Sequence, residues 1–428
     1  MSTVIKNGHV VDPKNKVDSV MDVLISKGKI EKVGKGLTGD KEIDAKGKIV
    51  VPGLIDMHVH LREPGREDKE TIETCSRAAA RGGFTSIVGM PNTTPTADDQ
   101  TVVKYVCSIA KETAIVNVFP TGNITKGSKG KELAQIGDLK RAGAIAVTDD
   151  GWDIKNTNIM RMAMEYLHKW QLPIISHSED FDLSGKDWAM HEGRVSTRLG
   201  LPGKPAEAEE VAIAKQIVLS SLTGYPIHFT HVNSVGALGL IKDAKKKGLK
   251  VTCDTCPHYF TLTDENVVGY DPNMKMNPPL RPKRHLKAVV NGLNDGTIDC
   301  ITTDHAPHLL IEKYLEFEHC VNGIVGLETS LPLVMTYLVN NGEIDMNRMV
   351  ELMSLNPATI LNLEGKGHLG VGADADITII DKDAKETIDK TLFESKGRNT
   401  PFDGWEVVSL PVMTIVNGKV VMKNRKIL

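Results

Sequence analysis

The chain has 428 residues, of which 40% are hydrophobic, so it can bury a large core. A formal net charge of −3 and an aromatic content of 4% exclude the basic, aromatic-lined surfaces that are typical of nucleic-acid-binding proteins. No apolar run reaches membrane-spanning length, and Thr3-Val4-Ile5 opens the chain without the apolar core of a signal peptide. We therefore expect a soluble cytoplasmic protein that binds neither nucleic acid nor membrane.

Both ends of the chain show short strands joined by tight turns. Asn7-Gly8 and Asn417-Gly418 each lie between two β-prone runs, which predicts a hairpin at each position. A further strand pair is expected across Gly28. Because isolated hairpins are only marginally stable in water, we expect residues 1–52 and 365–428 to form one small β-sandwich beside a central domain.

Residues 53–364 change to short apolar runs that alternate with stretches of helical character. The eight expected strands are Leu54–Val59, Thr85–Gly89, Ala114–Phe119, Ala144–Val147, Pro173–Ser176, Pro226–Thr230, Leu249–Cys253 and Ile298–Thr302. Helices are expected over about 68–82, 206–221, 235–247 and 282–293. Eight strands with helical crossovers predict an α/β fold, the (β/α)8 TIM barrel, whose functional residues lie at the C-terminal ends of the strands.

The Cys253-x-x-Cys256 pair is the one cysteine pattern that could indicate a metal or redox site. All six cysteines are scattered along the chain, and no second pair completes a structural zinc site. The absence of a secretory signal argues against a disulfide framework. We expect this pair to be buried as small apolar residues.

Histidines and aspartates follow several of the expected strands. His58 and His60 lie two apart on strand one, so their side chains project the same way. His177 follows strand five, His231 follows strand six, Asp304 follows strand eight, and strand four ends in Asp149-Asp150, of which only one can face the same side. Four histidines and two aspartates at one barrel rim are a typical ligand set for one or two divalent ions, with zinc favoured.

Six longer motifs surround these residues. They are Asp-x-His-x-His-Leu-Arg-Glu-Pro-Gly at 56–65, Met-Pro-Asn at 90–92, Thr-Asp-Asp-Gly at 148–151, His-Ser-Glu-Asp at 177–180, Lys-Met-Asn-Pro-Pro-Leu-Arg at 275–281 and Thr-Asp-His-Ala-Pro-His at 303–308. Together they resemble the class I dihydroorotases of the amidohydrolase superfamily over nearly the whole chain. The resemblance implies a hydrolase that acts on cyclic amides and reversibly closes N-carbamoyl-L-aspartate to L-dihydroorotate in de novo pyrimidine (UMP) biosynthesis.

The resemblance also implies a ligand set for Zn²⁺, with one or two ions per subunit and two favoured. In the family, the first histidine pair and the strand-eight aspartate hold one ion, and the histidines of strands five and six hold the other. The corresponding residues here are His58, His60 and Asp304 for one ion, and His177 and His231 for the other. Many relatives bridge the ions with a carbamylated lysine on strand four, whereas this chain resembles the branch that uses an aspartate. That assigns the bridge to Asp150 and leaves Asp149 to form a salt bridge or a cap.

Roles in the reaction follow from the same resemblance. Asp304 resembles the general base, which takes a proton from the metal-bound hydroxide and passes it to the amide nitrogen. The substrate carboxylate needs a cationic or amide-lined seat, for which Arg62, Asn92 and His308 are the candidates. Asn277 resembles the residue that contacts the ring.

Asp56 and residues 309–322 are two further features of the expected site. Asp56 shares a face with the histidine pair, so it is either a partner of the metal ligands or a charge at the barrel rim. Residues 309–322 depart from the polar mobile loop of the family, because Leu310, Tyr314 and Phe317 give them apolar, helix-like spacing. We predict a short helix or ordered flap there.

Two alternative functions stay open. One is another cyclic amidohydrolase, such as a hydantoinase, against which the missing strand-four lysine and the Arg62, Asn92 and His308 set both count. The other is a non-catalytic, dihydroorotase-like subunit that scaffolds aspartate transcarbamoylase, against which the intact ligand set counts. A homodimer and an association with aspartate transcarbamoylase are the partners that the resemblance implies.

Overall fold

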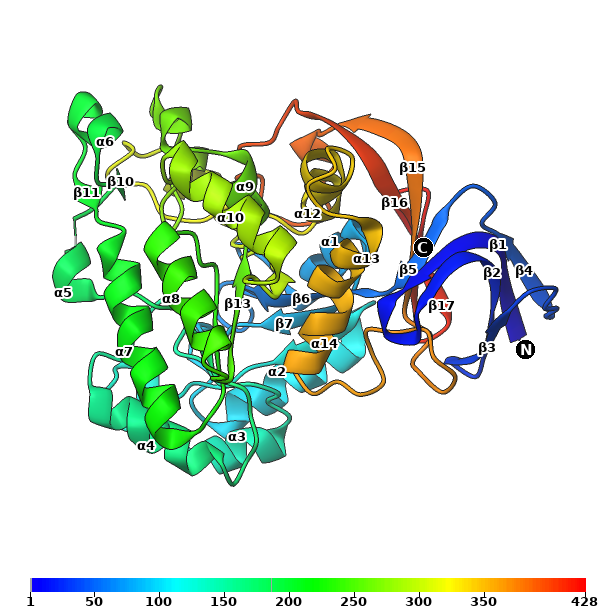
Figure 1. Cartoon of the computed structure of the whole chain (residues 1–428), viewed down its shortest axis with the longest axis horizontal. Helices are drawn as coiled ribbons and strands as arrows, with labels where there is room; N and C mark the ends of the chain where they lie inside the picture. Colours follow the sequence, from blue (N-terminus) through cyan, green and yellow to red (C-terminus); the bar gives the residue numbers. More distant parts are fainter. Residues whose placement is uncertain (1, 186) are drawn as a thin grey trace.

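A closed ring of parallel strands forms the centre of the protein in a computed structural model that describes residues 2–185 and 187–428 (Figure 1). Its two parallel sheets contain β6 (Leu54–Val59), β7 (Phe84–Gly89) and β8 (Asn117–Pro120), and β9 (Ile175–Ser176), β12 (Ile227–Phe229), β13 (Val251–Thr255) and β14 (Cys300–Ile301). Isolated bridges join the sheets: Val147 pairs with Gly122 and Ile174, and Val59 pairs with His305. These bridges close the barrel.

The fourth expected strand is the one that differs from the prediction. Among the described residues, 144–147 form no regular strand, and only Val147 pairs with both neighbours. The segment still occupies the strand position, because Ile145 N–H donates to Pro120 O and Val147 N–H donates to Pro173 O. The other seven expected runs each overlap an observed strand.

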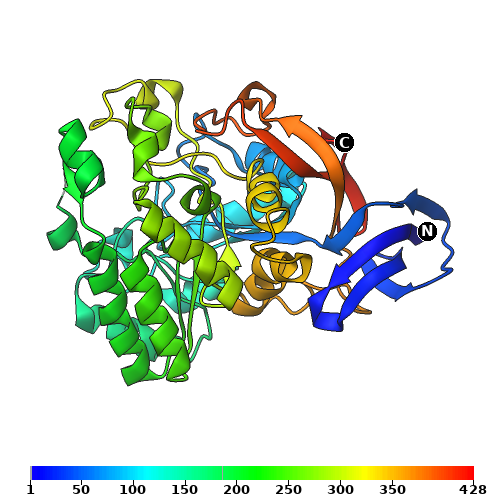
Figure 2. The same cartoon turned by 45° about the horizontal axis from the view of Figure 1, so that its top comes forward.

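Helices follow the barrel strands and cover the outside of the ring (Figures 1 and 2). They are α1 (Ile72–Gly82), α2 (Gln100–Thr113), α3 (Ile136–Ala142), α4 (Thr157–Leu167), α7 (Glu207–Thr223), α8 (Val235–Lys246) and α10 (Lys283–Asp295), followed by α12 (Ser330–Val334), α13 (Met346–Val350) and α14 (Asn356–Ile360). The first helix begins at a Thr71 capping box and ends where Gly83 turns left-handed, with a φ of 89°. The four predicted helices correspond to α1, α7, α8 and α10.

Strands from both chain ends form a single sheet beside the barrel. Nine strands of the described chain belong to it: β1 (Ser2–Asp12), β2 (Val17–Ser26), β3 (Lys29–Gly34), β4 (Lys41–Asp44), β5 (Ile49–Pro52), β15 (Ile377–Thr387), β16 (Glu406–Val416), β17 (Lys419–Lys423) and β18 (Lys426–Ile427). The join is at β5, which pairs parallel with β1 and antiparallel with β15. Apolar side chains of both ends, including Val10 and Ile377, pack in one cluster. The predicted fold class, a (β/α)8 barrel with a β-sandwich built from both termini, is confirmed.

The two Asn-Gly pairs have different structures. Asn417-Gly418 forms the predicted hairpin between β16 and β17. The hairpin predicted at Asn7-Gly8 is wrong, because β1 continues through it with a bulge where the register shifts. Asn7 takes a φ of 61° and its N–H donates to Asp22, while a Cβ on Gly8 would lie 2.4 Å from Val50 Cγ2. The close approach of β5 therefore explains why residue 8 is a glycine.

The domain boundaries that we expect at residues 52 and 364 stay predictions.

No helix of the described residues is both long and apolar enough to cross a bilayer. Cys253 and Cys256 are buried free thiols, as predicted, and burial raises the pKa of each.

Candidate metal centre

The six candidate ligands lie together at the C-terminal end of the barrel strands, and all are buried. Ligand atoms of His58, His60 and Asp150 lie within 4.8 Å of one another, and the same holds for Asp150, His177 and His231. Asp150 is therefore common to two adjacent groups, which is the arrangement that a carboxylate between two ions requires.

The distances place the second aspartate beside the first group. Asp304 Oδ1 lies 3.0 Å from His60 Nε2 and 3.4 Å from His58 Nε2. Asp150 Oδ1 lies 3.3 Å from His58 Nε2 and 4.0 Å from His177 Nδ1. His177 Nδ1 in turn lies 2.9 Å from His231 Nε2. Carboxylate oxygens and imidazole nitrogens thus converge on two neighbouring positions.

The charge balance of this cluster fits a divalent ion. His58 Nε2 is buried and has no hydrogen-bond partner among the described residues, although it faces two carboxylates. Burial lowers the pKa of His58, but Asp150 and Asp304 outweigh it and raise that pKa to about 10. Burial also disfavours charged carboxylates, yet the imidazoles hold the pKa of Asp150 and Asp304 well below the usual range. A bound cation would replace the proton on His58 as the counter-charge.

Hydrogen bonds behind the first histidine pair fix which nitrogen faces the cluster. His58 Nδ1 lies 2.8 Å from Thr230 Oγ1, and this hydroxyl donates to Asp254 at 3.2 Å. The hydroxyl therefore accepts from His58 Nδ1–H, which leaves the Nε2 lone pair for an ion. His60 Nδ1 donates to Asn92 Oδ1 at 3.0 Å with the same result.

His177 is oriented by a carboxylate that the sequence analysis did not assign. His177 Nε2 lies 3.2 Å from Glu179 Oε2, so Nδ1 faces His231 and Asp150. Thr230 and Asp254 were missed in the same way. The position of Glu179, two residues after His177 in the motif at 177–180, is a signal that could have found it.

Asp149 and Asp56 hold the backbone behind the ligands. Asp149 accepts from the N–H groups of Ile124 and Thr125 at 2.9 and 3.0 Å, so it fixes the backbone of the segment that follows β8. Asp56 is fully buried and accepts from the N–H groups of His58 and Thr303 at 3.0 and 3.2 Å. Burial raises the pKa of Asp56 to about 7. Asp56 therefore ties β6 to the segment after β14 and is not a charge at the rim.

Three site residues have a left-handed backbone without being glycine. Arg62, His231 and Asp304 have φ values of 62°, 45° and 49°. Such conformations cost free energy and persist where surrounding contacts fix them, which is common at functional sites. At His231 the fixing contact is its N–H, which donates to Asp254 Oδ1 at 2.6 Å.

The candidate substrate contacts line the same cavity as the ligands. The cavity has a volume of about 250 Å³, and its lining includes Arg62, Asn92, Asn277 and His308 together with five of the six ligands. Arg62 is held by its Nε, which donates to Pro307 O at 3.1 Å, and Arg62 Nη2 lies 3.3 Å from His308 Nε2. Arg62 therefore lies at the wall of a pocket that also contains five of the candidate metal ligands.

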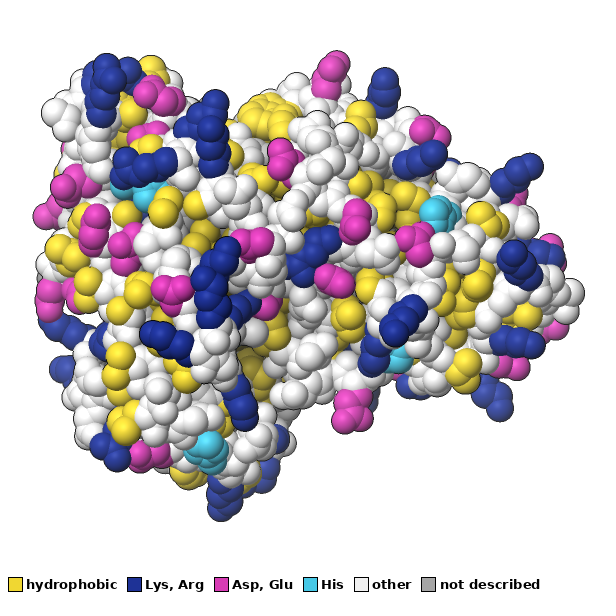
Figure 3. All heavy atoms as spheres, in the orientation of Figure 1, with side chains coloured by type: hydrophobic (Ala, Val, Ile, Leu, Met, Phe, Trp, Pro, Cys, Tyr) yellow, Lys and Arg dark blue, Asp and Glu magenta, His cyan; other side chains and the backbone are white. Residues whose placement is uncertain are grey.

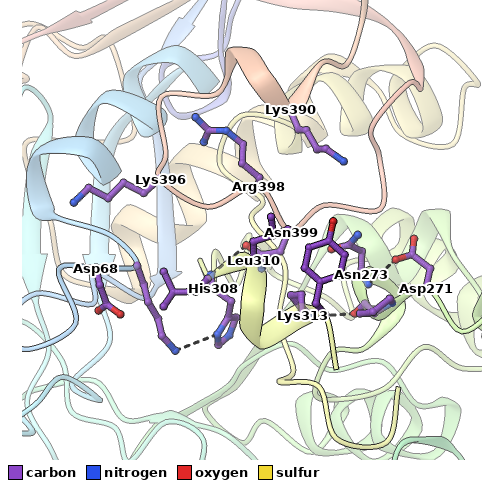
Figure 4. Close-up of a pocket in the computed structure, with 14 residues that line it drawn as sticks. Asp68, Asp271, Asn273, His308, Leu310, Lys313, Lys390, Lys396, Arg398 and Asn399 are labelled. Carbon is purple, nitrogen blue, oxygen red and sulfur yellow. Dashed lines mark hydrogen bonds between the residues drawn. The ribbon is translucent and has the colours of Figure 1, made fainter. Parts of the chain in front are cut away.

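The flap, residues 309–322, contributes Leu309, Leu310, Lys313 and Tyr314 to a second cavity of about 320 Å³ (Figure 4), and His308 lines both cavities. The flap contains the short helix α11 (Leu310–Lys313), as predicted. Of the predicted apolar face only Phe317 is buried, whereas Leu310 and Tyr314 are 65% and 77% exposed. Lys313 fixes the flap by donating to Pro272 O and Val321 O at 3.0 and 2.9 Å.

Comparisons with known proteins agree with this geometry. Residues 47–236 match a family model described as dihydro-orotase-like, and residues 265–422 match one described as amidohydrolase family. The chain is 51% identical to a dihydroorotase from Geobacter sp. (strain M21), covering 98% of this chain and 99% of that one. It is 49% identical to a dihydroorotase from Acetivibrio thermocellus, covering 99% and 100%.

The solved structure of an L-hydantoinase (dihydropyrimidinase) from Arthrobacter aurescens is also similar, with a TM-score of 0.89 at 26% identity over 100% of this chain and 97% of that one. The structural similarity to the hydantoinase covers the barrel and the terminal sheet, but the sequence identity is only 26%. The sequence identity to the dihydroorotase from Geobacter is 51% over almost the full length of both chains. The chain therefore belongs to the dihydroorotase family of the amidohydrolases.

Proposed function

We propose that the chain catalyses the reversible cyclisation of N-carbamoyl-L-aspartate to L-dihydroorotate, the dihydroorotase step of de novo pyrimidine biosynthesis. The observation that carries the proposal is the shared position of Asp150 between two ligand groups, in a cavity that Arg62 also lines. An aspartate at this position replaces the lysine of the hydantoinase-like relatives. The guanidinium supplies a seat for the carboxylate that distinguishes this substrate.

We propose two Zn²⁺ ions as the cofactor, bridged by Asp150. His58, His60 and Asp304 would hold one ion, and His177 and His231 would hold the other. When bound, the ions lower the pKa of a water molecule towards neutrality and polarise the substrate carbonyl. Imidazole and carboxylate ligands without a thiolate fit zinc in this role.

Asp304 is the proposed general base and acid. Its low pKa keeps the carboxylate ionised at neutral pH, and it lines the cavity beside His60 and His58. It takes the proton of the attacking water and delivers it to the ring nitrogen as the amide bond breaks; ring closure reverses these two transfers.

The proposed carboxylate seat combines the guanidinium of Arg62 with two neutral side chains, Asn92 and His308. Burial lowers the pKa of Arg62 to about 10, so its guanidinium stays charged at neutral pH. Asn92 uses its Oδ1 on His60, which leaves its amide N–H groups for the substrate. His308 lies between Arg62 and Lys69, and burial together with these cations lowers its pKa, so its imidazole is neutral.

A homodimer in the cytoplasm completes the proposal, with aspartate transcarbamoylase as a candidate partner. The scaffold alternative requires that the metal-loaded chain is inactive until this partner is added. Activity of the purified chain alone would exclude that alternative.

The fold similarity to hydantoinases favours one second candidate function, and a matched pair of substrates separates the two. L-Dihydroorotate and dihydrouracil differ only in the carboxylate. We expect kcat/KM to be about 10- to 150-fold higher for L-dihydroorotate, because a hydrogen bond to a charged group contributes about 1.5–3 kcal/mol. Faster hydrolysis of dihydrouracil would replace the proposal by a hydantoinase-like activity.

Asp304→Asn tests the proton transfer. Asparagine keeps the size of the side chain but cannot accept the proton, so we expect kcat to fall by about 10²- to 10⁴-fold. Metal content should be measured on the same sample, because the aspartate is also a candidate ligand. A nearly normal kcat would remove its role as the base.

Arg62→Met tests the carboxylate seat. Methionine keeps an unbranched stem without the charge, so we expect KM for N-carbamoyl-L-aspartate to rise by about 10-fold or more while metal content stays constant. The variant should lose most of the preference for L-dihydroorotate over dihydrouracil. An unchanged preference would place the seat elsewhere.

Thr230→Val tests the orientation of His58. Removing the hydroxyl leaves His58 Nδ1 without its acceptor, so we expect zinc affinity to fall by about 10- to 100-fold, measured by competition with a chelator. Thr378→Val is the matched control, because its hydroxyl is also buried and donates to Gly83 O at 2.6 Å, in the terminal sheet. Equal zinc affinity in the two variants would contradict the orienting role.

A further inference from the structure

Lys204 is a buried ammonium group that the proposed mechanism does not use. It lies on the two-residue strand β11 (Gly203–Lys204), is 2% exposed, and its Nζ lies 4.4 Å above the ring of Trp188. The same Nζ lies 2.6 Å from Glu179 Oε2 and 2.6 Å from Asn277 Oδ1. A buried charge is costly unless its partners are in place, so these contacts define the position of the group.

A single carboxylate oxygen connects Lys204 to the candidate metal centre. Glu179 Oε2 is the atom that faces His177 Nε2 at 3.2 Å, Lys204 Nζ at 2.6 Å and Asn277 Nδ2 at 3.1 Å. The ammonium balances the charge of the carboxylate that orients His177. Without it, Glu179 would be a buried anion whose remaining partners carry no fixed charge.

The chemistry of the two partners also sets the orientation of the Asn277 amide. An ammonium only donates, so the atom facing Lys204 is the amide oxygen; an ionised carboxylate only accepts, so the atom facing Glu179 is the amide nitrogen. One N–H of Asn277 and one lone pair of its oxygen remain, on a residue that lines the metal cavity. Lys204 thus fixes which groups Asn277 presents to the cavity.

We propose that Lys204 is a positioning residue that couples the ion position at His177 and His231 to the substrate contact at Asn277. The metal half of the inference rests on the proposed zinc ions, and the substrate half rests on the proposed reaction. One substitution at Lys204 should then produce two effects in two places, weaker metal binding and weaker substrate binding.

Lys204→Met in the full-length chain is the test, because methionine keeps the unbranched stem and removes the charge. We expect the affinity for one of two zinc ions to fall by about 10- to 100-fold, measured by chelator competition, and the other to change little. We also expect KM for N-carbamoyl-L-aspartate to rise by a larger factor than kcat falls.

Lys366→Met is the matched control for the loss of a buried lysine. Lys366 is 9% exposed and pairs with Asp376 at 2.6 Å and Asp374 at 3.1 Å, away from the metal cavity. A purely structural role for Lys204 would lower Tm in both variants and leave zinc affinity and KM unchanged in both. That result would overturn the inference.

Two further variants keep the test decisive. Lys204→Arg keeps the charge and should restore zinc affinity at least in part. In the double variant Glu179→Gln with Lys204→Met, the amide still accepts from His177 and no anion is left unpaired, so zinc affinity should exceed that of Lys204→Met. The double variant also replaces Lys204→Met if that variant does not fold, and it should then still show a raised KM. One further outcome separates the two proposals. If zinc affinity follows the charge at position 204 but the wild-type chain does not turn over L-dihydroorotate, the proposed function is refuted and the positioning role of Lys204 is not.

Discussion

The carboxylate of Asp150 is the point on which the site depends, because it faces histidines from both halves of the barrel. His58 and His60 come from β6 and the turn after it, whereas His177 and His231 follow β9 and β12. These segments meet only because the ring closes, through the bridge of Val59 to His305 on one side and of Val147 to its two neighbours on the other. The barrel therefore brings together two groups of candidate ligands that no contiguous stretch of the chain contains.

Three of the four candidate ligand histidines have a hydrogen-bond partner behind them, and each of these three uses a different kind of acceptor. A hydroxyl backed by Asp254 serves His58, an amide serves His60, and a carboxylate neutralised by Lys204 serves His177. Fixing the tautomer in advance reduces the ordering cost of binding an ion, since the lone pairs already face the cavity. The same contacts place buried polar groups in a network in which the loss of one partner affects its neighbours.

Strands, helix ends and ligands at strand ends could be predicted, because they depend on residues close together in the sequence. Features that depend on tertiary contacts could not be predicted from the sequence. The barrel strand Leu54–Val59 and the end of α1 at Gly83 follow from periodicity and capping, so both were predicted. Asn7-Gly8 has a hairpin sequence but lies inside a strand, because β2 pairs along one side of β1 while β4 and β5 pair on the other side, before and after these two residues. The candidate ligands were predictable because they lie at strand ends. Thr230 and Lys204 were not, since their roles depend on atoms far away in the sequence.

The pairing of β5 with β15 has a consequence for biosynthesis. Ile49–Pro52 are buried between strands from opposite ends of the chain, and Gly53 N–H donates to Asp376 O. On a translating ribosome, β5 lacks one neighbour until residues beyond 376 have emerged. The strand that carries His58 begins one residue after Gly53, so the histidine pair gains its final support only when synthesis is nearly finished. A nascent chain of this protein would thus bind metal ions in their native geometry late, after almost all of its residues have been made.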